Sequence, residues 1–285
     1  MKLLLLTLLV ALAVALPYTE QMLLANSMIV GRDDQLDLIN WECNVCEESN
    51  RPLHAHYIEE KGKDIKCVLS SYPKFHSLAF RYTNTLLNVW QDILYANQVV
   101  DTNVCNNCKI QKAYKGMWDT IREDVIADLK AMEAQTGLKQ LYITGISLGG
   151  GLAVISYIDI LKSKIFDKVD VITFGAPRVA NKYYADYFDD LTGSKSKRYA
   201  VKGDPIVVMP ECLTVLCNYK HTGSQYTCIE NDEKCTKDKK KEVKGFLHEM
   251  LWKKRADDSM KNLGSIVDHI YGYKKIYNFT EVEEQ

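Results

Sequence analysis

The 285-residue chain lacks an excess of charge of either sign. It has 36 lysines and arginines against 37 aspartates and glutamates, so its formal net charge is −1. A basic face is the electrostatic signature of nucleic-acid binding, and this composition gives no sign of one. Internal repeats and low-complexity linkers are also lacking. The length is then compatible with one large domain or two small ones.

Long apolar runs are scarce, the exception being residues 3–16, which follow a charged start at Lys2. This run is well short of the ~20 residues that a membrane-spanning helix needs, and no other segment is long enough. With the small-x-small site Ala13-Val14-Ala15 it predicts a secretory signal over residues 1–16, an uncleaved anchor being the alternative. We therefore expect residues 17–285 to form a mature chain exported to an extracellular, lumenal or digestive compartment.

Nine cysteines fit an oxidising compartment, where structural disulfides are expected. Four of them form two C-x-x-C pairs, Cys43/Cys46 and Cys105/Cys108. The others are Cys67, Cys212, Cys217, Cys228 and Cys235. A zinc site built from the two pairs and a redox-active pair are the alternatives. The odd count leaves at least one thiol free or paired between chains.

Two segments are expected at the surface. Asn278-Phe279-Thr280 is an N-glycosylation sequon, which an exported chain can use. Residues 211–245 are polar and contain the charged run 237–241, which predicts a solvated loop. A contact with an anionic surface is the alternative for that run.

The rest of the chain alternates between short apolar segments and segments with helical spacing. Strands are expected at 65–70, 75–82, 109–114, 140–144, 169–174 and 198–201. Helices are expected within 18–40, at 118–132 with a stop at Gly137, at 148–161 and at 181–190. This alternation predicts the α/β class, with one mostly parallel sheet covered by helices on both faces.

Between an expected strand and an expected helix lies the motif G-x-S-x-G, formed by Gly145, Ser147 and Gly149. A serine on a tight strand-to-helix turn is the nucleophile elbow of acyl-transfer enzymes. We expect glycine at both flanks, because a Cβ there would crowd the adjoining strand and helix. The alternative is a glycine-rich turn with an ordinary serine.

A nucleophilic serine needs a base and a carboxylate, which on this fold follow it in the order acid, then histidine. His221, His248 and His269 follow Ser147, and position favours His269 without deciding the matter. Asp204 directly follows an expected strand, as the acid should, although a turn aspartate before proline is common. Asp170 begins a strand instead, and Asp186, Asp189 and Asp190 are expected on the solvated face of a helix.

Several motifs, taken in their order along the chain, resemble the class 3 lipases, the family that includes the fungal triacylglycerol lipases. The resemblance covers the chain from Cys43 to Tyr271. Its motifs are residues 79–83, Asn88 with Asp92 and Ile93, residues 144–150, residues 173–179, residues 203–207 with Pro210, and residues 268–272. The pair Cys105/Cys108 also resembles a disulfide of the fungal enzymes.

The resemblance implies an α/β-hydrolase fold and a Ser147-Asp204-His269 triad. It also implies that Thr83 donates to the oxyanion through its backbone N–H and hydroxyl, with the N–H of Leu148 as second donor. Two residues depart from the family pattern. Tyr82 replaces the usual glycine, where a side chain could reshape the oxyanion corner and acyl pocket, and Ile146 replaces a frequent histidine.

Apolar residues recur at helical spacing just after Thr83. They are Leu86, Leu87, Trp90, Ile93 and Leu94. The resemblance implies a lid helix at this position, which would cover the serine in water and lay its apolar face on lipid at an interface. A helix packed permanently on the core is the alternative.

Together these features predict a secreted serine hydrolase that cleaves lipid esters at a lipid–water interface through an acyl-enzyme. The chemistry needs no metal and no organic cofactor. Within the same chemistry, a phospholipase A1, a galactolipid or feruloyl esterase and an acyltransferase are alternatives. From a different class, the alternative is an exported binding protein on an inactive hydrolase scaffold.

Overall fold

A computed structural model describes part of the chain. The described residues are 18–31, 38, 40–42, 46, 51–60, 65–82, 99–193, 195–204, 206–210, 219–229, 234–238 and 273. Several sequence predictions lie outside them. These are the signal sequence 1–16, Cys43, Thr83, the lid residues Leu86, Leu87, Trp90, Ile93 and Leu94, Cys212, Cys217, His248, His269 and Asn278.

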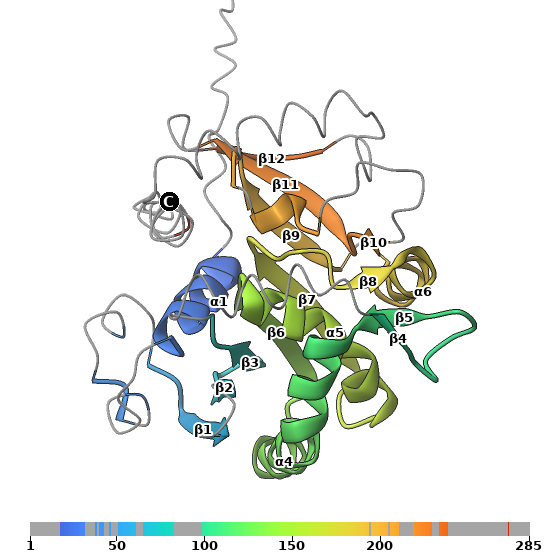
Figure 1. Ribbon diagram of the computed structural model, residues 1–285. Helices are drawn as coiled ribbons and strands as arrows, with labels where there is room; N and C mark the ends of the chain where they lie inside the picture. The colour runs from blue at the N-terminus through green and yellow to red at the C-terminus, as the bar shows by residue number, and fades with distance from the viewer. Residues whose placement is uncertain are drawn as a thin grey trace, which may run out of the picture.

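An eight-stranded sheet forms the centre of the described structure, in the order β1-β2-β3-β6-β7-β9-β11-β12 (Figure 1). Its strands are β1 (His54–Glu60), β2 (Ile65–Ser71), β3 (His76–Phe80), β6 (Gln140–Ile146), β7 (Lys168–Phe174), β9 (Lys197–Val201), β11 (Ser224–Ile229) and β12 (Lys234–Lys237). All pairings from β3 through β11 are parallel, and the edges pair antiparallel. The mostly parallel α/β sheet expected from the sequence is confirmed.

Helices cover both faces of this sheet because its strands alternate between two hydrophobic clusters. On β7, Val169 and Val171 join the cluster under α4 (Lys112–Thr136) and α5 (Leu148–Lys162). Ile172 and Phe174 point to the other face, which is covered by α1 (Tyr18–Ile29). Figure 1 shows α1 and α5 on opposite sides of the central strands. The strand β6, which precedes the candidate nucleophile, is likewise buried on both faces, because Leu141 and Ile143 join the first cluster and Ile146 joins the second.

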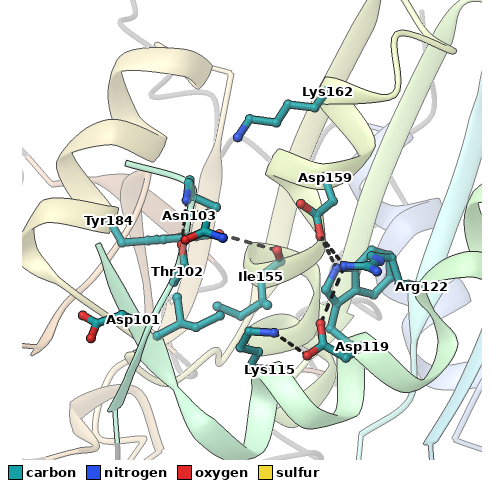
Figure 2. Close-up of a pocket in the computed structure, with 13 residues that line it drawn as sticks. Asp101, Thr102, Asn103, Lys115, Asp119, Arg122, Ile155, Asp159, Lys162 and Tyr184 are labelled. Atoms are coloured by element: carbon teal, nitrogen blue, oxygen red, sulfur yellow. Dashed lines mark hydrogen bonds and ion pairs between the residues drawn. The ribbon is translucent and has the colours of Figure 1, made fainter. Parts of the chain in front are cut away.

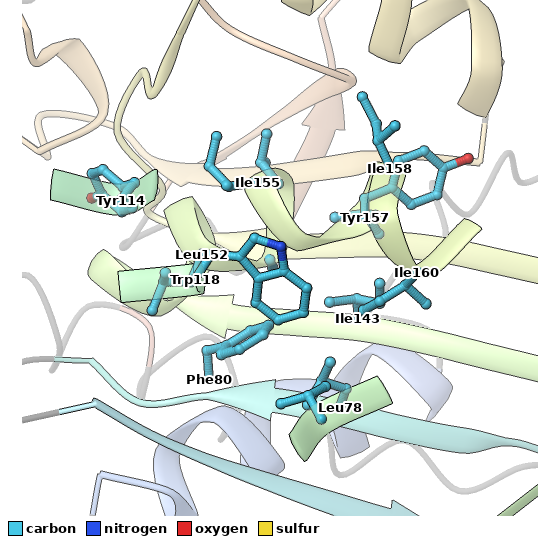
Figure 3. Packing of buried hydrophobic residues seen from close by; sticks show 14 of the residues in the cluster. Leu78, Phe80, Tyr114, Trp118, Ile143, Leu152, Ile155, Tyr157, Ile158 and Ile160 are labelled. Atoms are coloured by element: carbon cyan, nitrogen blue, oxygen red, sulfur yellow. The ribbon is translucent and has the colours of Figure 1, made fainter. Parts of the chain in front are cut away.

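The larger cluster fixes α5 to the sheet and to α4 (Figure 3). Trp118 of α4 packs edge-to-face on Phe80 of β3, with ring centroids 6.2 Å apart. Its indole N–H donates to Asp159 Oδ2 of α5 at 2.8 Å, so burying this ring leaves no donor unpaired. Full burial of each large side chain contributes about 2–3 kcal/mol. These contacts hold the helix that begins directly after Ser147.

A smaller sheet, in the order β10-β8-β5-β4, lies beside α6 (Figure 1). Its strands are β4 (Val99–Asp101), β5 (Lys109–Gln111), β8 (Ala180–Asn181) and β10 (Tyr219–Lys220), and the helix beside it, α6, spans Lys182–Thr192. Asn181 caps α6, since its Oδ1 accepts the Tyr184 N–H at 3.1 Å and the Lys109 N–H at 3.0 Å. This cap joins α6 to the β4–β5 segment.

Three sequence predictions about structure were wrong. The strand expected at 109–114 ends at Gln111 and α4 begins at Lys112, which lets Tyr114 and Trp118 share one buried helix face. The loop expected at 211–245 contributes β10, β11 and β12. Asp189 is 6% exposed rather than solvated, because its Oδ1 accepts the Gly223 N–H at 2.6 Å.

Disulfides join Cys105 to Cys108 and Cys228 to Cys235, with Cα atoms 5.2 and 4.0 Å apart. The first pair confirms the expected disulfide, and it contradicts the zinc alternative, which needs both residues as free thiolates. Cys46 is disulfide-bonded too. Within the described residues the free thiol is that of Cys67, and no helix there has the length and apolar character to cross a bilayer.

Candidate active site

Ser147 occupies a strained turn between β6 and α5. Its backbone angles, φ 57° and ψ −119°, are those of the first central residue of a type II′ turn, a position that normally takes glycine. Such a conformation costs about 1–3 kcal/mol, and the surroundings must hold it in place. The Ser147 N–H donates to the Phe174 carbonyl at 2.8 Å, and its own carbonyl accepts the Gly151 N–H at 3.2 Å. The residue therefore ends a strand ladder and begins a helix, and it is buried.

The glycines on either side of Ser147 are required by close packing. A Cβ on Gly145 would fall on the backbone of Gly149, with the Gly150 nitrogen at 2.6 Å. A Cβ on Gly149 would fall on the end of β3, with the Phe80 carbonyl carbon at 2.8 Å and the Arg81 carbonyl oxygen at 2.9 Å. The steric reason predicted for the motif is confirmed, and the elbow is pressed directly against β3.

Leu148 follows the serine as the first residue of α5. The first N–H groups of a helix have no partner within that helix and lie at the positive end of its dipole. An N–H in this position favours negative charge next to the Ser147 hydroxyl. This is the local chemistry that an oxyanion donor requires.

Asp204 lies just beyond the end of β9 and is 6% exposed. Gly203, with φ 96°, turns the chain, and the Asp204 N–H donates to the Val201 carbonyl at 3.1 Å. Its Oδ1 accepts the Ile206 N–H at 2.8 Å, and its Oδ2 accepts the Tyr273 hydroxyl at 2.8 Å. A buried carboxylate held on both oxygens has a fixed orientation, as the acid of a triad needs.

Tyr273 is a residue of this site that the sequence did not reveal. It is fully buried, and its hydroxyl also accepts the Val201 N–H at 3.0 Å. Burial, and then the Asp204 charge, raise the pKa of Tyr273 well above its ordinary value, so the hydroxyl stays protonated and donates. Its position four residues after His269 was the available signal.

The loop after Asp204 is held by two further residues that sequence reasoning did not place at the site. It contains the 3₁₀ turn η1 (Ile206–Val208). The Nη1 of Arg178 donates to the Val208 carbonyl at 2.6 Å and to the Pro210 carbonyl at 2.9 Å. His221 Nε2 donates to the Val207 carbonyl at 2.6 Å. Burial, followed by the nearby charges of Arg198 and Arg178, holds the pKa of His221 well below 6.5.

His221 was one of three candidate bases, and the structure gives it a structural role. A neutral imidazole that donates from Nε2 to a backbone carbonyl supports the turn after Asp204. Of the other two candidates, His248 and His269, neither lies within the described residues. His269 stays the predicted base.

The two residues that depart from the family pattern lie in one hydrophobic cluster on the α1 side of the sheet. Ile146 is fully buried there, and the half-buried Tyr82 packs against the same cluster. The Tyr82 ring lies against Gly31, just past the end of α1, where a Cβ would meet the ring carbon Cε1. Its side chain is therefore turned toward α1.

A cavity of about 260 Å³ lies between the β4–β5 segment, α4 and α5 (Figure 2). Neither Ser147 nor Asp204 lines it. Several of its charged side chains pair with one another, since Arg122 lies 4.0 Å from Asp159 and 3.8 Å from Asp119. Within the described residues, no group of histidine, cysteine, aspartate or glutamate side chains is arranged to hold a metal ion.

Residues 77–214 match the model of the family described as Lipase (class 3). Two curated relatives are secreted mono- and diacylglycerol lipases. The protein of Gibberella zeae is 27% identical over 157 residues, which cover 47% of this chain and 38% of that protein. The protein of Penicillium cyclopium is 26% identical over 149 residues, which cover 52% of this chain and 46% of that protein. The matched region thus spans less than half of these relatives' length.

Solved structures share the fold. The lipase of Rhizopus microsporus var. chinensis superposes with a TM-score of 0.62 at 19% identity, covering 74% of this chain and 72% of that one. The triacylglyceride lipase of Rhizomucor miehei gives 0.62 at 18% identity, covering 77% and 82%. The mostly parallel sheet, the tight turn at Ser147 after β6 and the position of Asp204 after β9 agree with the α/β-hydrolase fold of these structures. Residues 77–214, just under half of the chain, match the class 3 lipase family, and the fold agrees with that match.

Proposed function

We propose that this protein is a serine hydrolase that cleaves the carboxylic ester bonds of lipids, with acylglycerols as its substrate class. The observation that carries the proposal is the strained, buried Ser147 between β6 and α5. Backbone strain of this kind clusters at active sites, where the surrounding structure holds it in place. Relatives named as mono- and diacylglycerol lipases support the substrate class.

In this mechanism His269 removes the Ser147 proton and Asp204 orients the imidazole. The chain itself supports the pairing of Asp204 with His269. Tyr273 is hydrogen-bonded to Asp204, and His269 precedes it by four residues, a length that spans at most about 14 Å. The covalent chain therefore keeps the two predicted members near each other.

Hydrolysis proceeds in two steps. Ser147 Oγ attacks the ester carbonyl while its proton passes to His269, and the tetrahedral oxyanion accepts hydrogen bonds from the N–H of Leu148 and from Thr83. The proton then passes from His269 to the departing alcohol, leaving an acyl-serine. In the second step His269 takes a proton from water, which attacks the acyl group, and the proton returns to Ser147 as the fatty acid leaves.

Two further parts of the proposal rest mainly on the sequence. The segment after Thr83 acts as a lid that exposes its apolar face to a lipid surface, so the rate should jump when a short-chain ester passes its solubility limit. The chain is exported, which relatives named as secreted and the observed disulfides support. A rate that saturates smoothly through the solubility limit would contradict the lid.

The decisive experiment compares Ser147→Ala with Ser163→Ala. Both remove a hydroxyl from an end of the same helix, and the Ser163 hydroxyl only donates to the Ile160 carbonyl. Ser147→Ala should lower acylglycerol hydrolysis by about four orders of magnitude or more while unfolding in urea stays cooperative, and Ser163→Ala should stay within about twofold of the wild type. Substantial turnover by purified Ser147→Ala would overturn the assignment.

A fluorophosphonate probe then separates an enzyme from an inactive binding protein, because only an activated serine reacts quickly. We expect labelling of the wild type at Ser147 and none of Ser147→Ala. Rates on acylglycerols, phospholipids and short p-nitrophenyl esters define the preferred ester. Fastest turnover of phospholipids would contradict the acylglycerol assignment.

A further inference from the structure

The helix α1 lies across the two strands that lead to the proposed active site. Its Asn26 donates to Ser77 Oγ of β3 at 3.1 Å. Its Ser27 hydroxyl donates to the Leu23 carbonyl at 2.8 Å and lies 3.1 Å from Thr144 Oγ1 of β6, so Thr144 donates in the second bond. All these side chains are buried. One helix thus holds the strand before the nucleophile and the strand before Thr83 at a fixed spacing.

Beyond β3 the chain is held from two sides. On one side lies Gly149 of α5, so close that a Cβ there would fall on the carbonyl groups of Phe80 and Arg81. On the other side the Tyr82 ring lies against Gly31, two residues past the end of α1. Tyr82 is the residue directly before Thr83. Its ring therefore connects α1 to the point where the chain leaves β3 for the proposed oxyanion donor.

We propose that the contact between the Tyr82 ring and Gly31 is a positioning element for the oxyanion hole, which sets where residue 83 stands relative to the N–H of Leu148. This inference rests on the proposed function, because it requires Thr83 to act as a donor. A donor works when it lies 2.7–3.1 Å from the oxyanion, which exists only in the transition state. A displacement of about 1 Å can cost on the order of a hundredfold in rate.

The test measures kcat and KM on a soluble p-nitrophenyl ester, per active site titrated with a fluorophosphonate. Tyr82→Ala should lower kcat by roughly 10- to 100-fold and leave KM within about threefold. Binding of a trifluoromethyl ketone, whose adduct with serine carries the oxyanion, should weaken by the same factor as kcat/KM. Tyr82→Phe keeps the ring carbons that face Gly31 and should stay within about threefold of the wild type. Because each rate is divided by the concentration of titrated active sites, it refers to folded enzyme alone.

The second arm alters the other partner of the contact. Gly31→Ala places a Cβ on the Tyr82 ring and should also lower kcat, but it should have no further effect in the Tyr82→Ala background. Gly116→Ala on α4 is the matched control, because a Cβ there meets nothing within 4 Å. If Tyr82→Ala does not fold, Gly31→Ala alone carries the test.

Three results would overturn the inference. The first is a kcat of Tyr82→Ala within twofold of the wild type, and the second is a change of KM alone with unchanged binding of the ketone. The third is an additive effect of Tyr82→Ala and Gly31→Ala on kcat. The two proposals fail in distinguishable ways. A wild type without Ser147-dependent hydrolysis removes both, whereas an active wild type that is indifferent to Tyr82 removes this one alone.

Discussion

The hydroxyl of Tyr273 lies 2.8 Å from Asp204 Oδ2 and donates to it, while accepting the N–H of Val201 at 3.0 Å. The ring packs edge-on to Phe174 with centroids 6.5 Å apart. Phe174 in turn supplies the carbonyl that accepts the Ser147 N–H. One buried tyrosine therefore links the proposed acid, the end of β9 and the strand that supports the nucleophile.

Removing that hydroxyl with Tyr273→Phe should weaken the fold and the activity together. The buried N–H of Val201 and Oδ2 of Asp204 each lose a partner, which costs about 1–3 kcal/mol of unfolding free energy. The carboxylate also loses one of the bonds that orient it, so we expect kcat to fall several-fold with KM little changed. Urea unfolding and ester kinetics measure both effects, and a variant as stable as the wild type would contradict the network.

The elbow was predictable from the sequence because local sterics dictate it. Glycine at 145 and 149 leaves room for a turn that Ser147 could not otherwise adopt, and the flanking apolar segments identify the strand and helix. The mostly parallel pairing of the central strands follows from the alternation of apolar strand and helix segments. For these parts of the fold, neighbours in the sequence decide the structure.

The supports of Asp204 were not predictable, because they come from residues distant in the sequence. Arg178, His221 and Tyr273 reach the 201–210 segment from three distant parts of the sequence, and only packing brings them together. The strand β1 was missed for a different reason. Most of its side chains are at least partly exposed, so the sequence shows no apolar run there.

The packing of the elbow predicts a sharp contrast between two glycines. Gly149→Ala places a Cβ against the Phe80 and Arg81 carbonyls, which are backbone groups and cannot rotate away. We expect a loss of more than about 3 kcal/mol in unfolding free energy, or failure to fold. Gly116→Ala, in open space on α4, should instead gain about 0.5–1 kcal/mol from helix propensity. Equal effects in urea unfolding would contradict the close approach of α5 to β3.

Buried histidines predict that the fold loses stability in mild acid. Burial lowers the pKa of His76, and burial with nearby Arg198 and Arg178 lowers that of His221 further. Between these depressed values and 6.5 the unfolded chain binds more protons than the folded one, so stability rises with pH. The contribution of each neutral histidine to the free energy of unfolding is fully present above pH 6.5. It is lost as the pH falls below 6.5, by up to about 1.4 kcal/mol per pH unit for each group.

His221→Gln tests this sign. Glutamine can still donate to the Val207 carbonyl but does not titrate, so the slope of unfolding free energy between pH 6.5 and 5 should fall relative to the wild type. His54→Gln is the control for the substitution itself, because His54 is exposed on β1. An identical slope in all three proteins would show that His221 is not buried in its neutral form.

The free thiol of Cys67 should be inert in the folded protein. The residue is fully buried on β2, and burial, with a smaller contribution from Asp128, raises the pKa of the thiol. Because the thiolate is the reactive species, both inaccessibility and protonation slow alkylation. Iodoacetamide without reductant should therefore modify Cys67 at least a hundredfold faster in guanidinium than in native buffer, as peptide mapping by mass spectrometry would show. Cys105, Cys108, Cys228 and Cys235 should react only after reduction, and rapid native labelling of Cys67 would mean that β2 opens readily.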